Sequence, residues 1–118
     1  MREIKMNINT QPITLSHTEH KASEQLVQFM KIIAELHRFR IIQILFCNSK
    51  ISVTDLAHIL QISQPAVSQH LKILKLANIV DIYRNGRQIL YSHDVIGIRE
   101  KYGNGIDYLS DYFRNTHK

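Results

Sequence analysis

The sequence lacks the features that mark secreted, membrane-spanning and disulfide-stabilised proteins. Its first 17 residues contain no apolar core of a signal peptide, and no later apolar run approaches the length of a membrane span. Cys47 is the single cysteine, so no intrachain disulfide framework can form, and a reducing compartment fits this composition. We therefore expect a cytoplasmic protein that is neither secreted nor inserted in a membrane.

The residue patterns that support catalysis are also missing. The chain has no Gly-rich phosphate-binding loop, no serine at a strand-to-helix elbow and no pair of carboxylates on one apolar face. It has no internal repeat and no low-complexity segment either. We therefore expect neither an enzyme nor a bound cofactor.

Length and charge set the remaining bounds. A chain of 118 residues with 44% hydrophobic residues predicts one compact domain with a modest core. The formal charge of +5 is compatible with a polyanionic partner. Residues 63–93 carry a net charge of +3, from Lys72, Lys75, Arg84 and Arg87 against Asp81. More than half of the excess positive charge therefore lies in this one segment.

The most specific pattern lies in residues 51–92, where two short helices precede a hairpin. Ser52 and Asp55 can form a capping box at the start of the first helix. The apolar face of that helix consists of Leu56, Ala57, Ile59 and Leu60. Ser63 caps the second helix, and Pro65 falls in its first turn, where a proline costs no hydrogen bond. The order is that of a helix-turn-helix followed by a wing.

The second of these helices, expected at about residues 63–76, has an unusually polar outer face. Val67, Leu71 and Leu74 turn inward, with Ile73 at the margin of that side, which leaves Gln64, Ala66, Ser68, Gln69 and Lys72 outside. Long amides can donate to and accept from one base edge in a DNA major groove, and serine can bind a base or a phosphate. An ordinary solvated helix face explains the same residues, so this helix alone does not decide.

The expected wing occupies residues 79–92. Two strand-like segments, residues 79–84 and 87–92, flank Asn85-Gly86, the strongest short signal for a hairpin. A loop of these two residues predicts three cross-strand pairs: Arg84 with Arg87, Ile82 with Ile89 and Val80 with Tyr91. Two facing cations are favourable only near an anion, such as a phosphate backbone, whereas simple solvation at a mobile tip is the alternative.

The segment before this pattern predicts a flexible arm and two helices. Residues 1–15 show no helical period, and this predicts that they form the flexible arm. One helix begins at Ser16 or Thr18. The next begins near residues 35–37, with Arg38 and Arg40 in its first turn, either near phosphates or simply solvated.

A last helix, at about residues 94–114, carries an apolar seam formed by Val95, Ile98, Tyr102, Ile106, Leu109 and Phe113. The N-terminal helix, or its counterpart from a second subunit, is the expected cover and the main argument for a homodimer. The expected dimer interface is Leu26, Met30, Ile98, Tyr102, Ile106, Leu109 and Phe113. Gly103 and Gly105 each cost a helix about 1 kcal/mol relative to Ala. They mark a kink, a break or a close approach of two backbones.

Residues 33–94, a little over half of the chain, resemble the ArsR/SmtB-type winged-helix repressors of bacteria. The resemblance rests on Arg38-Phe39-Arg40-Ile41, Asp55-Leu56-Ala57, the run LQISQPAVSQHL at residues 60–71, Leu74 and Asn85-Gly86-Arg87. It implies a homodimer that binds operator DNA and releases it when an inducer is sensed. The chain departs from the family at Glu35-Leu36, where family members usually have an Asp-Pro or Asn-Pro helix break, and the resemblance alone places the boundary there.

Members of that family often sense metal ions, but neither of two well-known metal sites carries over to this chain. The Cys-x-Cys pair of one site falls at Ser52 and Thr54, which bind soft metals poorly. The ligand positions of the other site look like Val95 and Gly97, then Tyr108 and Asp111. No metal site is therefore expected at either place.

Three other groups are candidate sensors, each with a plainer interpretation. His17 and His20 could hold zinc or nickel with a partner's Asp107, Asp111 or His117, although chain ends also collect solvated histidines. His70, inside the second helix of the pair, is expected to make a structural hydrogen bond. Cys47 ends an apolar helix and is therefore expected to be a half-buried packing residue. The alternative, a redox-sensing intermolecular disulfide, needs an exposed thiol of low pKa.

Together these features predict a mostly α-helical winged helix-turn-helix domain with a small β-hairpin over residues 16–118, homodimeric through its N- and C-terminal helices. We expect a DNA-binding transcriptional regulator, most simply a repressor of an inverted-repeat operator that an unidentified signal releases. The residues expected at DNA are Ser63, Gln64, Ala66, Ser68, Gln69, Lys72, Arg84 and Arg87. The rival is a winged-helix module that binds another protein and no DNA. The sequence names neither the operator nor the inducer.

Overall fold

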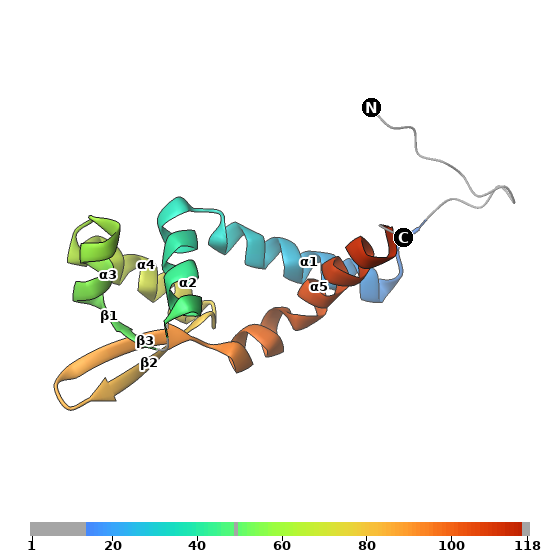
Figure 1. The fold of residues 1–118 in the computed structure, drawn as a ribbon. Helices are drawn as coiled ribbons and strands as arrows, with labels where there is room; N and C mark the ends of the chain where they lie inside the picture. Colours follow the sequence, from blue (N-terminus) through green and yellow to red (C-terminus); the bar gives the residue numbers. More distant parts are fainter. Residues whose placement is uncertain (1–13, 49, 117–118) are drawn as a thin grey trace, which may run out of the picture.

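The computed structural model describes residues 14–48 and 50–116, and these form five helices and three strands (Figure 1). In chain order they are α1 (His17–Ile33), α2 (Leu36–Cys47), β1 (Ile51–Ser52), α3 (Val53–Leu60), α4 (Gln64–Leu76), β2 (Val80–Asn85), β3 (Gln88–His93) and α5 (Val95–Thr116). Helices α2, α3 and α4 gather beside the sheet, whereas α1 and α5 pair with each other and extend away. The predicted fold class is confirmed for a single subunit. The predicted arm falls almost wholly outside the described residues.

Caps of two different kinds start the first two helices. Ser16 accepts a hydrogen bond of 3.1 Å from the Glu19 amide, and the Glu19 carboxylate accepts one of 3.2 Å from the Ser16 amide. Glu35 caps α2 by folding its carboxylate back onto the Arg38 amide at 2.8 Å. Glutamate is not among the usual N-cap residues, so no local pattern marks this boundary. The predicted break near residues 35–37 is nevertheless confirmed.

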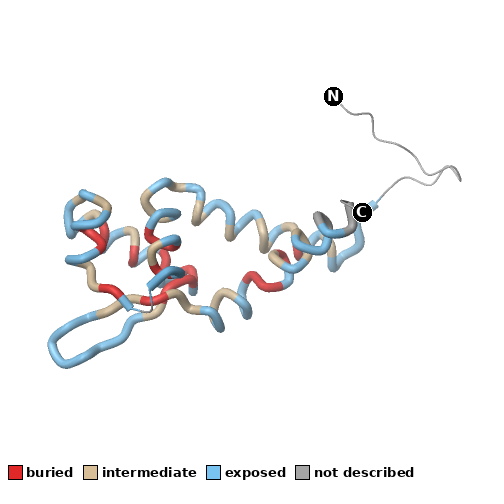
Figure 2. The backbone as a smooth tube through the Cα atoms, in the orientation of Figure 1, coloured by how far each residue is buried: buried red, intermediate tan, exposed pale blue. Residues whose placement is uncertain are grey.

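The hydrophobic core lies where α2, α3 and α4 meet the base of the sheet (Figure 2). Its fully buried side chains include Ile41, Leu45, Leu56, Val67, Leu71, Leu74, Ile79 and Val80. Burying each of these contributes about 1.5–3 kcal/mol relative to leaving it in water. Two residues that the sequence placed toward the core lie further out than expected, since Ile59 of α3 is 53% exposed and Ile73 of α4 is 38% exposed.

In the part of the chain that the structure describes, no helix has both the length and the apolarity to cross a membrane.

Helix α5 runs without a break and rests directly on α1. A Cβ atom at Gly105 would lie 2.7 Å from both the Ala22 carbonyl oxygen and the Leu26 amide nitrogen. Of the three explanations left open by the sequence, close backbone approach is therefore the correct one for Gly105. Tyr102, one turn earlier, is fully buried and packs against the tilted ring of Phe29 with ring centroids 5.0 Å apart. Its hydroxyl donates a 2.7 Å hydrogen bond to the Ala77 carbonyl.

The burial of Tyr102 corrects one part of the predicted dimer interface. Its side chain has no exposed surface, so it holds α5 onto the rest of its own subunit and has nothing to offer a second copy. Leu26, Ile98, Ile106 and Leu109 are half-buried in the subunit, and Met30 is 48% exposed. The side chain of Phe113 lies outside the described residues.

The sheet has the order β1-β3-β2, and its hairpin register differs from the predicted one. Asn85 pairs with Gln88, so the two turn residues are Gly86 and Arg87, and Arg84 lies opposite Ile89. Gly86 has a φ of 64°, whereas Arg87 is not among the residues with positive φ. A positive φ at the first turn position alone is the pattern of a type II′ turn, which places glycine first. The predicted pairs Arg84 with Arg87, Ile82 with Ile89 and Val80 with Tyr91 are therefore wrong. In each pair the observed partner lies two residues further along the chain than the predicted one.

Strand β1 was not predicted, because two residues are too short to show an alternating pattern. Ile51 pairs with Tyr91 and Ser52 with Leu90, so β1 joins the wing to the start of α3. Ser52 also accepts a 3.1 Å hydrogen bond from the Asp55 amide, as the predicted cap requires. Strand β3 of the wing therefore pairs with β2 on one side and with β1 on the other.

The close contact at Gly105 predicts opposite effects for two substitutions in α5. Gly105→Ala places a methyl group against the α1 backbone, which cannot yield locally, so we expect Tm to fall by roughly 5 °C or more. Gly103→Ala is the matched control, since its Cβ meets only side-chain carbons of Arg99, at 3.1 and 3.7 Å, and alanine favours a helix. Thermal unfolding followed by circular dichroism measures both. Equal changes in Tm would show that α1 and α5 are not in close backbone contact.

Candidate nucleic-acid interface

The turn between α3 and α4 determines how α4 is presented. Gln61 adopts a left-handed conformation with φ 56°, and the amides of Gln61 and Ile62 donate to carbonyl groups in the last turn of α3. Ser63 follows at once as the cap of α4, accepting a 3.2 Å hydrogen bond from the Ala66 amide. One helix therefore ends and the next begins within three residues, although no glycine marks the turn.

The two sides of α4 have opposite character. Val67, Leu71 and Leu74 are at most 1% exposed and face the core. The predicted outward residues Gln64, Ser68, Gln69 and Lys72 are all exposed, and Ala66 is half-buried. Ser63 is exposed as well, and because its oxygen accepts the cap hydrogen bond, its hydroxyl hydrogen remains free to be donated. The structure thus keeps four of the five predicted outer residues of α4 exposed, with Ala66 half-buried among them and Ser63 exposed at the N-cap.

The wing carries its two cations near its tip. Arg84 and Arg87 are both exposed, but the observed register puts them diagonally on the hairpin, with Arg84 on β2 and Arg87 in the turn. The argument from two directly facing cations therefore does not hold. The wing and the α3–α4 pair nevertheless project at the same end of the molecule, away from α1 and α5 (Figure 1).

A groove of about 240 Å³ separates α4 from the wing. Its helical wall is formed by Ser68, Lys72, Lys75 and Leu76, which the helical period places on one side of α4, and its other wall includes Ile82 and Tyr91 of the sheet. The sequence analysis counted Lys75 only as a charge, although its spacing of seven from Ser68 already places the two residues on one side of the helix. Lys75 extends the polar surface of α4 toward the wing.

Lys75 has a carboxylate beside it. Its ammonium nitrogen lies 3.3 Å from an Asp81 carboxylate oxygen, with 45% and 41% of the two side chains exposed. The same Asp81 oxygen accepts a 2.8 Å hydrogen bond from the Ile82 amide. This amide bond first, and Lys75 second, lowers the pKa of Asp81 although partial burial raises it. Asp81 is therefore a fixed negative charge at the base of the wing.

Two residues near the α1–α2 junction differ from expectation. The guanidinium of Arg38 donates a 2.6 Å hydrogen bond to the Ile32 carbonyl, so it holds the junction together, while Arg40 is exposed. His70 makes no hydrogen bond through Nδ1, contrary to the structural bond predicted for it. Its Nδ1 atom instead lies 3.7 Å from a carboxylate oxygen of Glu35.

The candidate sensor groups are not assembled in the subunit. No three His, Cys, Asp or Glu side chains within residues 14–48 and 50–116 are placed to hold a metal ion. Asp107 binds Arg99 at 2.9 Å and Asp111 binds Arg114 at 3.6 Å, while His17 and His20 are exposed and His117 lies outside the described residues. Cys47 is exposed, so the prediction of a half-buried packing residue is wrong.

The geometry defines the class of protein: a helix-turn-helix pair followed directly by an antiparallel wing makes this a winged helix-turn-helix protein. A family model described as "Bacterial regulatory protein, arsR family" matches residues 37–81, which cover α2, β1, α3, α4 and the start of β2. The helix-turn-helix and the start of the wing are therefore similar to the arsR family of bacterial regulatory proteins, in agreement with the resemblance seen in the sequence.

Named relatives agree with this assignment. The HTH-type transcriptional repressor SmtB of Mycobacterium tuberculosis is 51% identical over 44 residues, 37% of this chain and 33% of the relative. The cadmium resistance transcriptional regulatory protein CadC of Listeria innocua is 32% identical over 63 residues, 53% of each chain. The structure of the transcriptional repressor BigR from Xylella fastidiosa superposes with a TM-score of 0.63 at 25% identity, over 84% of this chain and 93% of that one. The chain thus matches between a third and about half of the length of these two curated relatives.

Proposed function

We propose that the protein is a DNA-binding transcriptional regulator, most simply a repressor. The observation that carries this proposal is the row of exposed amide, hydroxyl and ammonium groups on α4, a helix whose opposite side is sealed in the core. Such a helix can enter a major groove while Val67, Leu71 and Leu74 stay buried in the core. The relatives SmtB, CadC and BigR are transcriptional regulators by name, which supports the same function here.

The proposed contacts follow from the chemistry of each side chain. Gln64, Ser68 and Gln69 bind base edges, because amides and hydroxyls both donate and accept hydrogen bonds. Ala66 lies among them and offers a methyl group to a thymine methyl. The phosphate contacts come from Ser63, Lys72, Arg84 and Arg87, with an arginine of the wing also able to enter the adjacent minor groove.

A homodimer formed through α1 and α5 completes the proposal. Val27 and Met30 of α1 are 47% and 48% exposed, and Val95 and Ile96 of α5 are 62% and 71% exposed, so one subunit leaves apolar surface in water on both helices. A second copy related by a two-fold axis would cover this surface and present its own α4 about one helical turn of DNA away. The operator is then an inverted repeat.

Removing the wing cations should lower the salt dependence of DNA binding. In Arg84→Ala/Arg87→Ala, two phosphate contacts are lost, so the slope of log K against log salt should shrink by roughly two units. Lys21→Ala/Lys31→Ala removes the same charge from exposed positions on α1 and serves as the control. Fluorescence anisotropy with a duplex selected for binding measures all three proteins. An unchanged slope in the wing variant removes the wing from the interface, and an absence of DNA binding by the wild type favours a protein-binding module.

Asp81 should restrain binding to any duplex, because it pairs with Lys75 and repels nearby phosphates. Exposed ion pairs are worth about 0–1 kcal/mol, so Asp81→Asn should raise affinity by roughly two- to fivefold for operator and random DNA alike. Much of the gain should disappear when Lys75→Gln is added. A loss of affinity in Asp81→Asn would mean that the carboxylate supports the interface.

A charge placed on the exposed face of α1 should separate the subunits. Met30→Glu introduces a carboxylate where the dimer would bury an apolar side chain, so the variant should sediment as a monomer at micromolar concentration. Ile59→Glu is the matched control, since Ile59 is 53% exposed on α3, away from α1 and α5. Analytical ultracentrifugation compares the two variants with the wild type. A monomeric wild type would refute the dimer outright.

A further inference from the structure

Glu35, His37 and His70 form a partly buried cluster where the α1–α2 junction meets α4. The His70 Nδ1 atom lies 3.7 Å from a Glu35 carboxylate oxygen, and the rings of His37 and His70 have centroids 5.8 Å apart. The Nδ1 atoms of both histidines are buried and have no hydrogen-bond partner. Two unpaired buried nitrogens are costly, because each has lost its hydrogen bond to water without gaining one in the protein. The DNA-facing role proposed above does not use them.

The carboxylate in this cluster is held in place and stays charged. The Arg38 amide donates to it at 2.8 Å, and this bond is the main reason that the pKa of Glu35 lies below its ordinary value. The His37 amide and the charges of His70 and His37 lower it further, while burial acts in the opposite direction. A lowered pKa means that Glu35 remains ionised throughout the range in which histidines titrate. His70 therefore faces a permanent negative charge.

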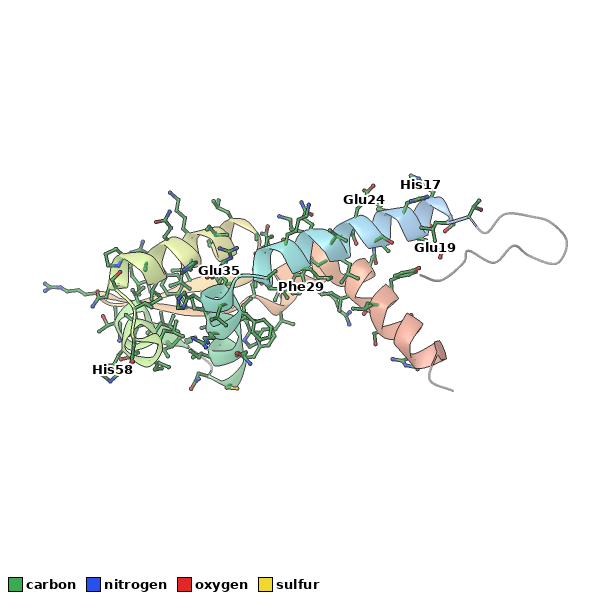
Figure 3. The ribbon with its side chains drawn as sticks, turned by 90° about the horizontal axis from the view of Figure 1, so that it is seen from above. His17, Glu19, Glu24, Phe29, Glu35 and His58 are labelled. Atoms are coloured by element: carbon green, nitrogen blue, oxygen red, sulfur yellow. The ribbon has the colours of Figure 1, made fainter. Side chains whose placement is uncertain are left out.

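The other charged side chains near α4 are occupied elsewhere or exposed. Lys75 pairs with Asp81, and the guanidinium of Arg38 binds the Ile32 carbonyl. The remaining charged or titratable groups on α4 and on the elements packed against it are Lys72, Arg40, Cys47, Asp55, His58, Tyr83 and Arg84, all of them exposed. Lys72 extends from the groove side of α4, whereas His70 lies on the side toward Glu35. Figure 3 shows Glu35 at the junction and His58 at the far end of the molecule on α3.

We propose that Glu35 is a positioning residue for DNA binding, which holds α4 through His70 and does so more strongly when His70 is protonated. This inference rests on the proposed function. When both nitrogens of the His70 ring carry a proton, the 3.7 Å approach to the carboxylate becomes an ion pair, which a small movement converts to a charge-assisted hydrogen bond.

The consequence is a DNA affinity that depends on pH. As pH falls from 8 to 6, α4 gains both a positive charge and a firmer attachment to the α1–α2 junction. Both changes favour the DNA complex, so affinity should rise about three- to tenfold over this range at constant salt. The effect reaches DNA through α4 alone, because His70 lies on the side of the helix that faces its own subunit.

The first experiment needs no DNA. The ring protons of His70 are followed by NMR between pH 5 and 9 in the wild type and in Glu35→Gln. Glutamine keeps an oxygen for the Arg38 amide and removes only the charge, so α2 keeps its cap. The response of the His70 ring protons to pH should differ between the wild type and Glu35→Gln, and Glu35→Asp should restore the wild-type response. An identical titration in wild type and Glu35→Gln overturns the coupling between the two residues.

The second experiment measures DNA affinity from pH 8 to 6 for the same proteins, for His70→Gln and for the control His58→Gln. The pH-dependent gain should be lost in His70→Gln, reduced in Glu35→Gln, where His70 can still gain its positive charge, and kept in His58→Gln. His70→Asn replaces His70→Gln if circular dichroism shows that the latter is unfolded. An unchanged pH profile in the His70 variant overturns the positioning role and leaves the proposed function intact. A wild type that binds no duplex at any pH overturns the proposed function, and the positioning role falls with it.

Discussion

The burial of one side of α4 is the constraint on which the rest of the structure depends. Val67, Leu71 and Leu74 are completely or almost completely removed from water, among side chains of α2, α3 and the sheet. Turning α4 about its axis would expose them, at a cost of about 1.5–3 kcal/mol for each side chain. The direction in which Gln64, Ser68 and Gln69 point is therefore set by the hydrophobic core. A surface that reads base edges needs this rigidity, because a hydrogen bond weakens quickly with distance and angle.

The features that the sequence predicted correctly are those with local causes. Ser16 and Ser63 start their helices because a hydroxyl three residues ahead of an amide can accept its hydrogen, and the period of Val67, Leu71 and Leu74 is visible without knowing what covers them. The residues of α4 that do not belong to this apolar period are then expected to face outward. For the same reason the margins were less certain, and Ile73 and Ile59 lie further out than expected.

The features that the sequence missed depend on a choice between locally equal alternatives or on distant partners. Asn85-Gly86 and Gly86-Arg87 both make acceptable two-residue turns, because glycine serves at the second position of one type and at the first position of the other. The contacts of β3 with β1, 40 residues earlier in the chain, are not visible in the hairpin itself. The ion pair between Lys75 and Asp81 and the approach of His70 to Glu35 likewise join residues from different elements. Gly105 could be understood only once α1 was known to lie against it.

Helix α4 meets α5 and the α1–α2 junction at two separate points. At its C-cap, Ala77 accepts the hydrogen bond of Tyr102 from α5, and nearer its middle His70 faces Glu35, the N-cap of α2. A single contact would allow α4 to tilt about that point, whereas two contacts at different positions along the helix restrict its tilt. The two differ in kind: burial raises the pKa of Tyr102, so its hydroxyl keeps its proton at ordinary pH, while the contact with His70 gains strength only with a proton. If α1 and α5 hold two subunits together, a change in their packing reaches α4 through one constant link and one adjustable link. The adjustable link is then the place where the orientation of α4 can be altered without disturbing the core.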